Sequence, residues 1–315
     1  MSKEILCYEK GGYRMTLAPW QGGQLIRLQK GELDLLHAPD NEDALALKPT
    51  HYGLPVLFPP NRIDAGHFAA AGREYQFPLN EPQRGNSLHG FLHTRPWEVE
   101  SVQDSVEAVT VVLRFTARSM ADFYPYYPHC FTIRMRYTLS ERGLEQEVSV
   151  HNEGSETMPV GLGFHSAFAV DAGSTVCLSA GQRVLMSERM LPTGIRSLNE
   201  KEAALRGKGL DVHAWSMDDH YTAEPLIFAR GAYHGAVIAR DAGRVYYEVD
   251  SFYRHWMVWN AGGDQNFICL EPQNWRVNAP NLVSEKRLSE EEAGFTLLPP
   301  AGQLKAVSRI WMEAY

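Results

Sequence analysis

The sequence predicts an all-β fold: one large domain of mostly antiparallel strands, built as a sandwich or a barrel with long loops. Segments in which apolar and polar residues alternate with period two recur along the whole chain. Helical periodicity is scarce, so the strands do not alternate with helices as they do in doubly wound α/β folds. The chain has 315 residues, 44% of them hydrophobic, and no linker or repeat divides it, so we expect a single domain over residues 1–315.

The clearest element is a β-hairpin in the middle of the chain. In Phe131–Leu139 every second residue is apolar, and Leu144–Val150 repeats the alternation with Gln146 on the apolar face. The short loop Ser140–Gly143 between them ends in glycine, which adopts positive φ without steric cost. We therefore predict two paired strands with one buried face.

Aromatic and β-branched residues, which suit half-buried strands, dominate further segments. These predicted strands are Tyr13–Leu17, Val109–Thr116, Arg244–Val249, Trp256–Trp259, Phe267–Leu270 and Lys305–Trp311. Leu198–Leu205 is the best candidate for a helix, and Ser289–Ala293 is predicted to form a helical turn.

The charge balance argues against a nucleic-acid partner. The net charge is −8, from 38 acidic and 30 basic residues, without a basic cluster to neutralise phosphates. No stretch of 18 apolar residues predicts a membrane span, and no apolar run near the start predicts a secretory signal. The four cysteines are scattered without a CxxC pattern, so we expect reduced thiols and a cytoplasmic location.

Four segments place a polar, titratable residue among glycines, prolines and aromatic residues, which is typical of a shaped pocket. In the first, Tyr52–Phe68, the apolar strand Leu54–Phe58 runs into two prolines that stiffen the approach to Asn61 and Arg62. The Arg62 guanidinium could donate hydrogen bonds to a polar ligand, or it could pair with a nearby carboxylate such as Asp64.

The second segment, Asn86–Trp97, contains His89, followed by a glycine that permits close backbone approach. His89 and His93 lie four residues apart, but on a strand or loop this spacing has no metal-ligand geometry, and no HExxH pattern is present. We therefore expect no metal site. A hydrogen-bonded, half-buried histidine remains the alternative interpretation of His89.

In the third segment, Val160–Asp171, His165 lies among small and apolar residues. Desolvation there lowers the pKa of an imidazole toward the range that suits proton transfer, although a core histidine bonded to a backbone carbonyl fits the same pattern. In the fourth segment, Asn266–Leu282, a predicted strand ends at Glu271, and Pro272 is expected to terminate its pairing. Burial would raise the pKa of this carboxyl into the range of a general base, and a structural buried glutamate is the alternative.

Taken in order, these segments resemble the aldose 1-epimerase (galactose mutarotase) family. The resemblance covers nearly the whole chain and rests on an ordered set of motifs. They are APWQGGQLIRL, LPVLFPPNRI, NSLHGF, FYPYYPHCF, GFHSAF, MLPTGI, DDHY and CLEPQN. It implies a large β-sandwich of the galactose mutarotase type, with a sugar bound across one sheet. It also implies a small-molecule sugar as substrate and no cofactor, and we expect a monomer or a homodimer.

The resemblance also implies roles for individual residues. Glu271 would be the base that removes the proton from the C1 hydroxyl, and His165 the acid that protonates the ring oxygen, so that the hemiacetal opens and recloses as the other anomer. His89 would support the region around the ring oxygen. Further residues would bind the sugar hydroxyls: Asn61, Arg62, Asp219 in the DDHY segment, Gln273 beside Glu271, and His255 at a position where many members have glutamine.

The chain departs from the family pattern in three places. HSAF replaces an HPYF-like segment, EPQN differs from the ETQ form, and His255 replaces the glutamine that would contact the sugar, which puts the hexose preference in doubt. Some members act on phosphorylated hexoses, which Arg84, Arg95 and Arg276 could recognise, although they form no tight cluster in the sequence. A carbohydrate-binding protein without catalysis, and a glycosidase or lyase, also remain alternatives, since one fold carries several functions.

Overall fold

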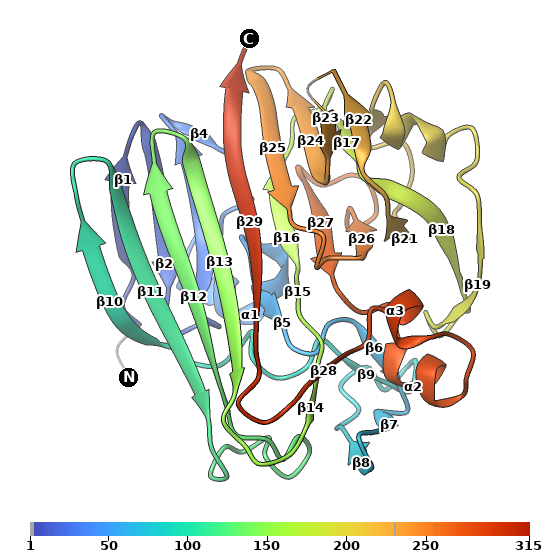
Figure 1. The fold of residues 1–315 in the computed structure, drawn as a ribbon. Helices are drawn as coiled ribbons and strands as arrows, with labels where there is room; N and C mark the ends of the chain where they lie inside the picture. Colours follow the sequence, from blue (N-terminus) through green and yellow to red (C-terminus); the bar gives the residue numbers. More distant parts are fainter. Residues whose placement is uncertain (1–2, 230) are drawn as a thin grey trace.

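The computed structural model describes residues 3–229 and 231–315, of which strands make up half and helices under a tenth. The all-β prediction is therefore confirmed. The largest sheet has nine antiparallel strands and forms the front layer of Figure 1. In spatial order its strands are β10 (Glu98–Asp104), β11 (Ala108–Ala117), β12 (Phe131–Ser140), β13 (Gly143–Asn152), β29 (Gln303–Ala314), β25 (Gly243–Val249), β24 (Gly235–Arg240), β17 (Thr175–Leu178) and β20 (Leu210–Asp211).

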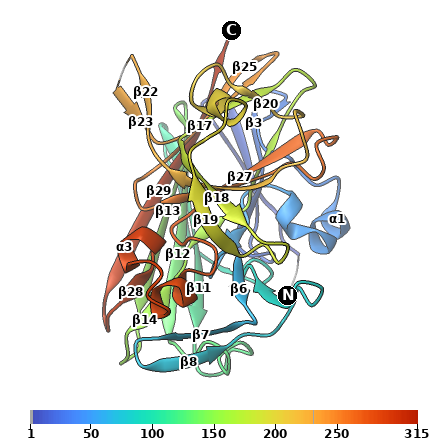
Figure 2. The same cartoon turned by 90° about the vertical axis from the view of Figure 1, so that its right-hand side faces the viewer.

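Two further sheets form the second layer. An eight-stranded sheet contains, in order, β19 (Pro192–Arg196), β18 (Ala180–Met186), β21 (Asp218–Ala223), β26 (His255–Trp259), β27 (Phe267–Gln273), β15 (Gly163–Phe164) and β5 (Val56–Leu57), with β16 (Ser166–Ala169) also paired to β27. A four-stranded sheet contains β1 (Leu6–Lys10), β2 (Tyr13–Ala18), β3 (Gln24–Lys30) and β4 (Leu33–Asp34). Figure 2 shows the nine-stranded sheet at the left and the second layer, including β3 and β27, at the right.

The remaining elements are short. Four two-stranded ribbons pair β6 (Arg62–Asp64) with β9 (Asn86–Leu88), β7 (His67–Ala70) with β8 (Arg73–Gln76), β14 (Met158–Val160) with β28 (Thr296–Leu298), and β22 (Leu226–Phe228) with β23 (Gly231–Tyr233). The helices are α1 (Glu42–Leu47), α2 (Ala279–Ser284) and α3 (Glu290–Ala293), with 3₁₀ turns η1 (Pro49–His51) and η2 (Glu202–Arg206).

The two layers enclose one large apolar core, which makes the fold a β-sandwich, as the resemblance implies. Tyr247 of the nine-stranded sheet packs edge-on against Trp256 of the eight-stranded sheet, with ring centroids 6.2 Å apart. The Tyr247 hydroxyl also makes a 3.0 Å hydrogen bond with Ser166. On the other side of the core, the Tyr137 hydroxyl donates to the carbonyl of Gly23 just before β3. These contacts fix the two layers relative to each other.

Apart from Leu54–Phe58, all the predicted strands from Tyr13 to Trp311 lie within observed strands, and the predicted hairpin is β12 with β13, where Ser140 pairs with Gly143. The turn at Ser289 is also confirmed: α3 starts at a capping box in which Ser289 and Glu292 bond each other's backbone amides.

Two predictions of local structure are wrong. The helix expected at Leu198–Leu205 is only the 3₁₀ turn η2, because Asn199 and Glu202 each accept a hydrogen bond from the other's backbone amide and hold a tight turn. Pro272 does not end its strand, since β27 continues to Gln273. On one side of β27, the adjacent segment is divided into the two short strands β15 and β16. A proline, which has no amide proton to donate, is therefore tolerated in β27 beside this break. The strand expected at Leu54–Phe58 is shortened to β5.

Candidate active site

The register of the eight-stranded sheet brings His165 and Glu271 together. Gly163 pairs with Gln273 and Ser166 pairs with Leu270, so His165, between β15 and β16, lies directly opposite Glu271 of β27. Directly opposed residues of antiparallel strands point to the same face of a sheet. The Nε2 atom of His165 accordingly lies 3.1 Å from Oε1 of Glu271.

The local sequence explains this close approach. Gly163 has no side chain, and a Cβ atom there would lie 2.9 Å from the Cβ of Gln273, so only glycine lets the chain pass this close to β27. The backbone amide of His165 donates to the carbonyl of Pro55 at 3.0 Å, away from β27. The close approach of Gly163 to Gln273 on one side and the bond to Pro55 on the other therefore hold the backbone of His165 in place.

The electrostatics of the pair follow from burial. His165 and Glu271 are 6% and 3% exposed, so both are nearly buried without being sealed from solvent. Burial, followed by the field of His51, lowers the pKa of His165 to about 3. Burial, reinforced by the carboxyl of Asp218, raises the pKa of Glu271 well above its usual range.

Both shifts favour the same arrangement of protons. A single proton on the pair is favoured on the carboxyl of Glu271, with the imidazole of His165 neutral, because burial raises the pKa of the first group and lowers the pKa of the second. The pair is therefore a strongly perturbed donor and acceptor in direct contact, which is the arrangement required for moving a proton to one atom of a ligand and from another.

Half-buried side chains surround the pair and provide access to it. The His89 ring lies edge-on to His165 with centroids 5.4 Å apart, and its backbone φ of +63° is maintained by Gly90 and by its amide bond to the carbonyl of Asn61. Trp259 of β26 packs edge-on against His165 at 5.7 Å, and His51 of η1 packs against Trp259 at 5.0 Å. The structure thus places His89 next to the pair.

The structure does not bring Asp219 to the pair. Asp219 pairs with Val258 of β26, whereas Glu271 pairs with Met257, so the two acidic residues lie on opposite faces of the sheet. The Asp219 carboxylate accepts hydrogen bonds from Arg183, Tyr221 and Trp215 instead.

Asp218 takes the place expected for Asp219. It pairs with Trp259 and therefore lies on the face that carries Glu271. Burial raises the pKa of Asp218, and the charge of Arg62 acts in the opposite direction. Sequence reasoning missed Asp218 because only the register decides which of two adjacent carboxyls faces the site.

Beyond the pair, the same face carries three buried polar side chains. His255 and Gln273 are opposed across β26 and β27, and His220 of β21 lies opposite Met257, next to Glu271. Within the described chain, neither ring nitrogen of His220 or His255 and neither amide atom of Gln273 has a hydrogen-bond partner. Burial lowers the pKa of both histidines well below the usual value, so both are neutral. A hollow of about 520 Å³ is lined by Thr222 and His255 but by neither His165 nor Glu271.

Asn61 and Arg62 are placed by the β6–β9 ribbon. Asn61 is buried with a φ of +59°, and its side-chain oxygen accepts the amide of Arg62 at 3.0 Å. The guanidinium of Arg62 donates through Nε and Nη2 to Glu81, not to Asp64. Its charge still lowers the pKa values of Glu271 and His89. The pairing of Arg62 with Leu88 in the β6–β9 ribbon places it beside His89 and so near the pair.

Two of the three arginines considered for phosphate recognition are engaged elsewhere. Arg84 donates to Glu81 at 2.8 Å, and Arg95 is paired with Asp122. The Nε atom of Arg276 has no partner among residues 3–229 and 231–315. Over the same residues, no group of three His, Cys, Asp or Glu side chains is arranged to hold a metal ion. No helix in the described ranges is long and apolar enough to cross a membrane.

Comparison with known proteins gives consistent matches. The family model for aldose 1-epimerase matches residues 5–288, a range that contains every site residue above. The galactose mutarotase of Rattus norvegicus is 30% identical over 279 residues, which cover 75% of this chain and 74% of that protein. The uncharacterized protein YihR of Escherichia coli strain K12 is 28% identical over 208 residues, and the match spans 62% of its length. A galactose mutarotase-like protein from Clostridium acetobutylicum, of known structure, superposes with a TM-score of 0.95 at 30% identity, covering 99% of this chain and 95% of that one.

Proposed function

The chain belongs to the aldose 1-epimerase family, and on this premise we propose that it is a mutarotase, an isomerase that interconverts the α and β anomers of a free aldohexose. The observation that carries the proposal is the 3.1 Å contact between His165 and Glu271 on a nearly buried sheet face. Opening a hemiacetal requires one group that takes the proton of the C1 hydroxyl and one that gives a proton to the ring oxygen. Both oxygens are bonded to C1, so the two groups must lie close together.

The proton count of the pair fits this reaction. Glu271 as carboxylate takes the proton from the C1 hydroxyl, His165 as imidazolium protonates the ring oxygen, and the bond between C1 and the ring oxygen breaks as the aldehyde forms. After rotation of the aldehyde, the reversed transfers close the ring as the other anomer. The pair holds one proton throughout. In the open-chain state that proton is on Glu271, which is the arrangement that burial favours, so the site stabilises the intermediate.

We assign binding roles to the polar groups around the pair. His89 supports the ring-oxygen region, because its ring lies beside that of His165, with centroids 5.4 Å apart. Asn61, Arg62 and Asp218 face the substrate from the β6–β9 ribbon and from β21. The unpartnered atoms of His255 and Gln273 bond hydroxyl groups on the far side of the sugar, because buried polar groups otherwise lose hydrogen bonds to water without compensation.

The test is anomer equilibration of freshly dissolved α-D-glucose and α-D-galactose, followed by polarimetry or exchange NMR, with their 6-phosphates in the same panel. Acceleration of a free hexose supports the proposal, and acceleration of phosphates alone would replace it with a hexose-phosphate mutarotase. Sugar binding without acceleration at any pH would identify a carbohydrate-binding protein, and cleavage of an added oligosaccharide would identify a glycosidase or lyase.

A further inference from the structure

Glu81 is a buried carboxylate outside the residues assigned above. It lies at the base of the turn Glu81–Asn86, where the two end residues exchange backbone hydrogen bonds and Gly85 adopts a φ of +65°. Pro82 at the second position of the turn and glycine near its end suit this tight geometry. The side chain of Glu81 is 4% exposed, so its charge needs partners inside the protein.

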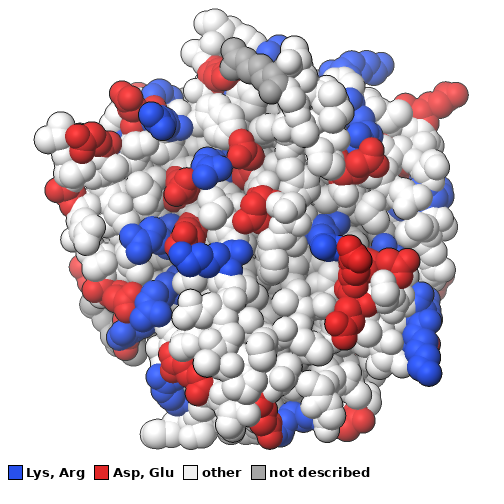
Figure 3. Space-filling view, viewed as in Figure 1, with Lys and Arg blue, Asp and Glu red and all other residues white. Residues whose placement is uncertain are grey.

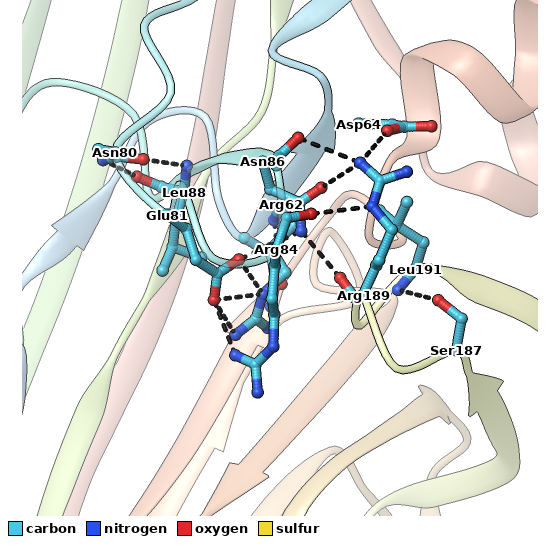
Figure 4. A network of polar contacts seen from close by, with 12 residues as sticks. Arg62, Asp64, Asn80, Glu81, Arg84, Asn86, Leu88, Ser187, Arg189 and Leu191 are labelled. Carbon is cyan, nitrogen blue, oxygen red and sulfur yellow. Dashed lines mark hydrogen bonds and ion pairs between the residues drawn. The ribbon is translucent and has the colours of Figure 1, made fainter.

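Figure 4 shows those partners converging on the carboxylate. Arg62 donates to it through Nε at 2.9 Å and through Nη2 at 3.0 Å, in a two-bond arrangement that fixes the plane of the guanidinium. Arg84 donates through Nη1 at 2.8 Å, and the side-chain amide of Asn86 at 3.1 Å. Glu81 therefore fixes the orientation of the Arg62 guanidinium. Its negative charge balances one of the two positive charges of Arg62 and Arg84.

A second set of contacts fixes the turn itself. Arg189, in the loop between β18 and β19, reaches across to Asp64 at 2.5 Å and donates to the carbonyls of Arg84 and Gly85 (Figure 4). The side-chain amide of Asn86 in turn donates to the carbonyl of Arg189 at 2.8 Å. Because the turn is held from outside, the Glu81 carboxylate has a defined position relative to Arg62.

Arg62 lies next to the reacting pair, because it pairs with Leu88, which precedes His89, and the ring of His89 lies 5.4 Å from that of His165. From this position its positive charge lowers the pKa values of Glu271, His89 and Asp218. Other titratable groups surround the pair, and they are Asp218 and His220 of β21, His255 of β26, His51 of η1, and His89 and His93 after β9. Cys269 lies two residues before Glu271 on β27. Among these groups, Arg62 is the permanent positive charge, and Glu81 is its direct counter-charge.

We propose that Glu81 is a positioning residue for the mutarotase reaction, a role that rests on the proposed function: by holding the guanidinium of Arg62 and balancing its charge, it sets the pH range in which the Glu271–His165 pair works. Glu81 does not touch the sugar or the reacting atoms. It acts through Arg62.

The decisive variant is Glu81→Gln, which keeps the shape of the side chain and removes its charge. One more unbalanced positive charge then lies near the pair, so the pair loses its single proton at lower pH. We expect the alkaline limb of the pH profile of kcat/KM to move toward acid by about one pH unit. A purely structural role would lower activity at every pH without moving the limb, and that result would overturn the proposal.

Two further variants separate charge from geometry. Glu81→Asp keeps the charge on a shorter side chain, so we expect the limb to stay in place while KM rises by about 10-fold, because Arg62 is held less well. If Glu81→Gln does not fold, an unchanged KM in Glu81→Asp would by itself refute the positioning role. Glu145→Gln is the matched control, because it removes a carboxylate from an exposed arginine pair on the outer sheet and should change neither quantity. A limb that moved equally in Glu81→Asp and Glu81→Gln would contradict the charge argument.

A titration of the free protein separates this proposal from the proposed function. The side-chain carboxyl carbon of Glu271, which bears the proton of the pair in the empty site, can be followed by NMR without substrate, in the native chain and in Glu81→Gln. Earlier loss of the proton of the pair in the variant would support the role of Glu81 even if no sugar were isomerised. Catalysis by the native chain with identical titrations in both proteins would refute the role of Glu81 and leave the mutarotase proposal intact.

Discussion

Polar side chains differ in burial and in pairing between two faces of the molecule. The outer face of the nine-stranded sheet carries charged residues that are partly exposed and paired. Arg309 bonds Glu145 at 2.9 Å and Glu248 at 3.2 Å, and Arg134 bonds Glu100 at 2.7 Å. Figure 3 shows such blue and red side chains interspersed over the front of the molecule. The site face of the eight-stranded sheet instead carries buried polar groups, several of them without partners in the described chain.

This difference in burial and pairing affects the free energy of folding in different ways on the two faces. An exposed ion pair contributes little to the free energy of folding, because water solvates each charge nearly as well as the partner does. A buried polar atom without a partner lowers stability by roughly 1–3 kcal/mol. We therefore attribute the unpartnered groups of His220, His255 and Gln273 on the site face to a ligand that supplies the missing hydrogen bonds. The predictions below test this contrast, beginning with the largest expected effect.

Glu271→Gln should lower kcat by about 10²–10⁴-fold, because an amide keeps the shape of the carboxyl but cannot carry the proton. Anomer exchange of α-D-galactose by NMR measures the rate, and saturation-transfer NMR measures binding of the sugar. Binding should persist within about threefold, since the side-chain contacts remain. A variant with the native rate would remove Glu271 from the mechanism.

The pH profile of the native chain should show a broad plateau. Activity requires one proton on the pair. Burial lowers the pKa of His165 to about 3, so a second proton is added only in strong acid, and the raised pKa of Glu271 retains the first proton well above pH 4.5. We therefore expect no loss of kcat/KM between pH 7 and roughly pH 5, where an ordinary histidine would titrate. An acid limb near pH 6.5 would show that His165 is solvated.

Gln273→Leu and Gln146→Leu should change stability in opposite directions. Both glutamines are buried in strands. Gln273 has no partner in the described residues, so its replacement should stabilise the fold by about 1–2 kcal/mol while raising KM for the sugar. Gln146 bonds Tyr137 and Ser308, so its replacement should cost about 1–3 kcal/mol. Urea unfolding measures both, and equal destabilisation by the two variants would contradict the contrast.

Arg309→Met, on the outer face, should have the smallest effect. Removing an exposed arginine that bridges two carboxylates is expected to change the free energy of unfolding by less than about 1 kcal/mol, and less at high salt. The rate of anomer exchange should be unaffected. A larger loss of stability in 1 M salt would show that the outer face contributes more than paired surface charge.

The sequence predicts the nine-stranded sheet better than the sheet that carries the site. Strands such as Phe131–Ser140 have one face toward the core and one toward water, so their alternation is visible in the residues. Strand β27, Phe267–Gln273, is buried on both faces and shows no alternation, so neither its passage through Pro272 nor its register could be read from the residues.

The same limit applies to the site. Glu271, His165 and His89 stand out because a titratable residue among glycines and apolar residues is a local signal. The choice between Asp218 and Asp219 depends on their pairing with Trp259 and Val258, which lie about 40 positions later in the chain. Short helices such as α1, Glu42–Leu47, lack the length for a periodic signal. Glu81 gives no local signal, because its role depends on Arg62 approaching it across the β6–β9 ribbon.

The position of β29 has a consequence for the assembly of the chain. This strand, the last in the sequence, lies between β13 and β25 in the middle of the nine-stranded sheet. Before it is in place, the β10–β13 meander and the β25–β24–β17–β20 segment have no hydrogen bonds to each other, and each exposes an unpaired edge. Because its partners in β13 lie about 160 positions earlier, the closing step brings distant parts of the chain together and is expected to be slow and late. During synthesis on the ribosome, the nine-stranded sheet is therefore completed only after Gln303–Ala314 has emerged.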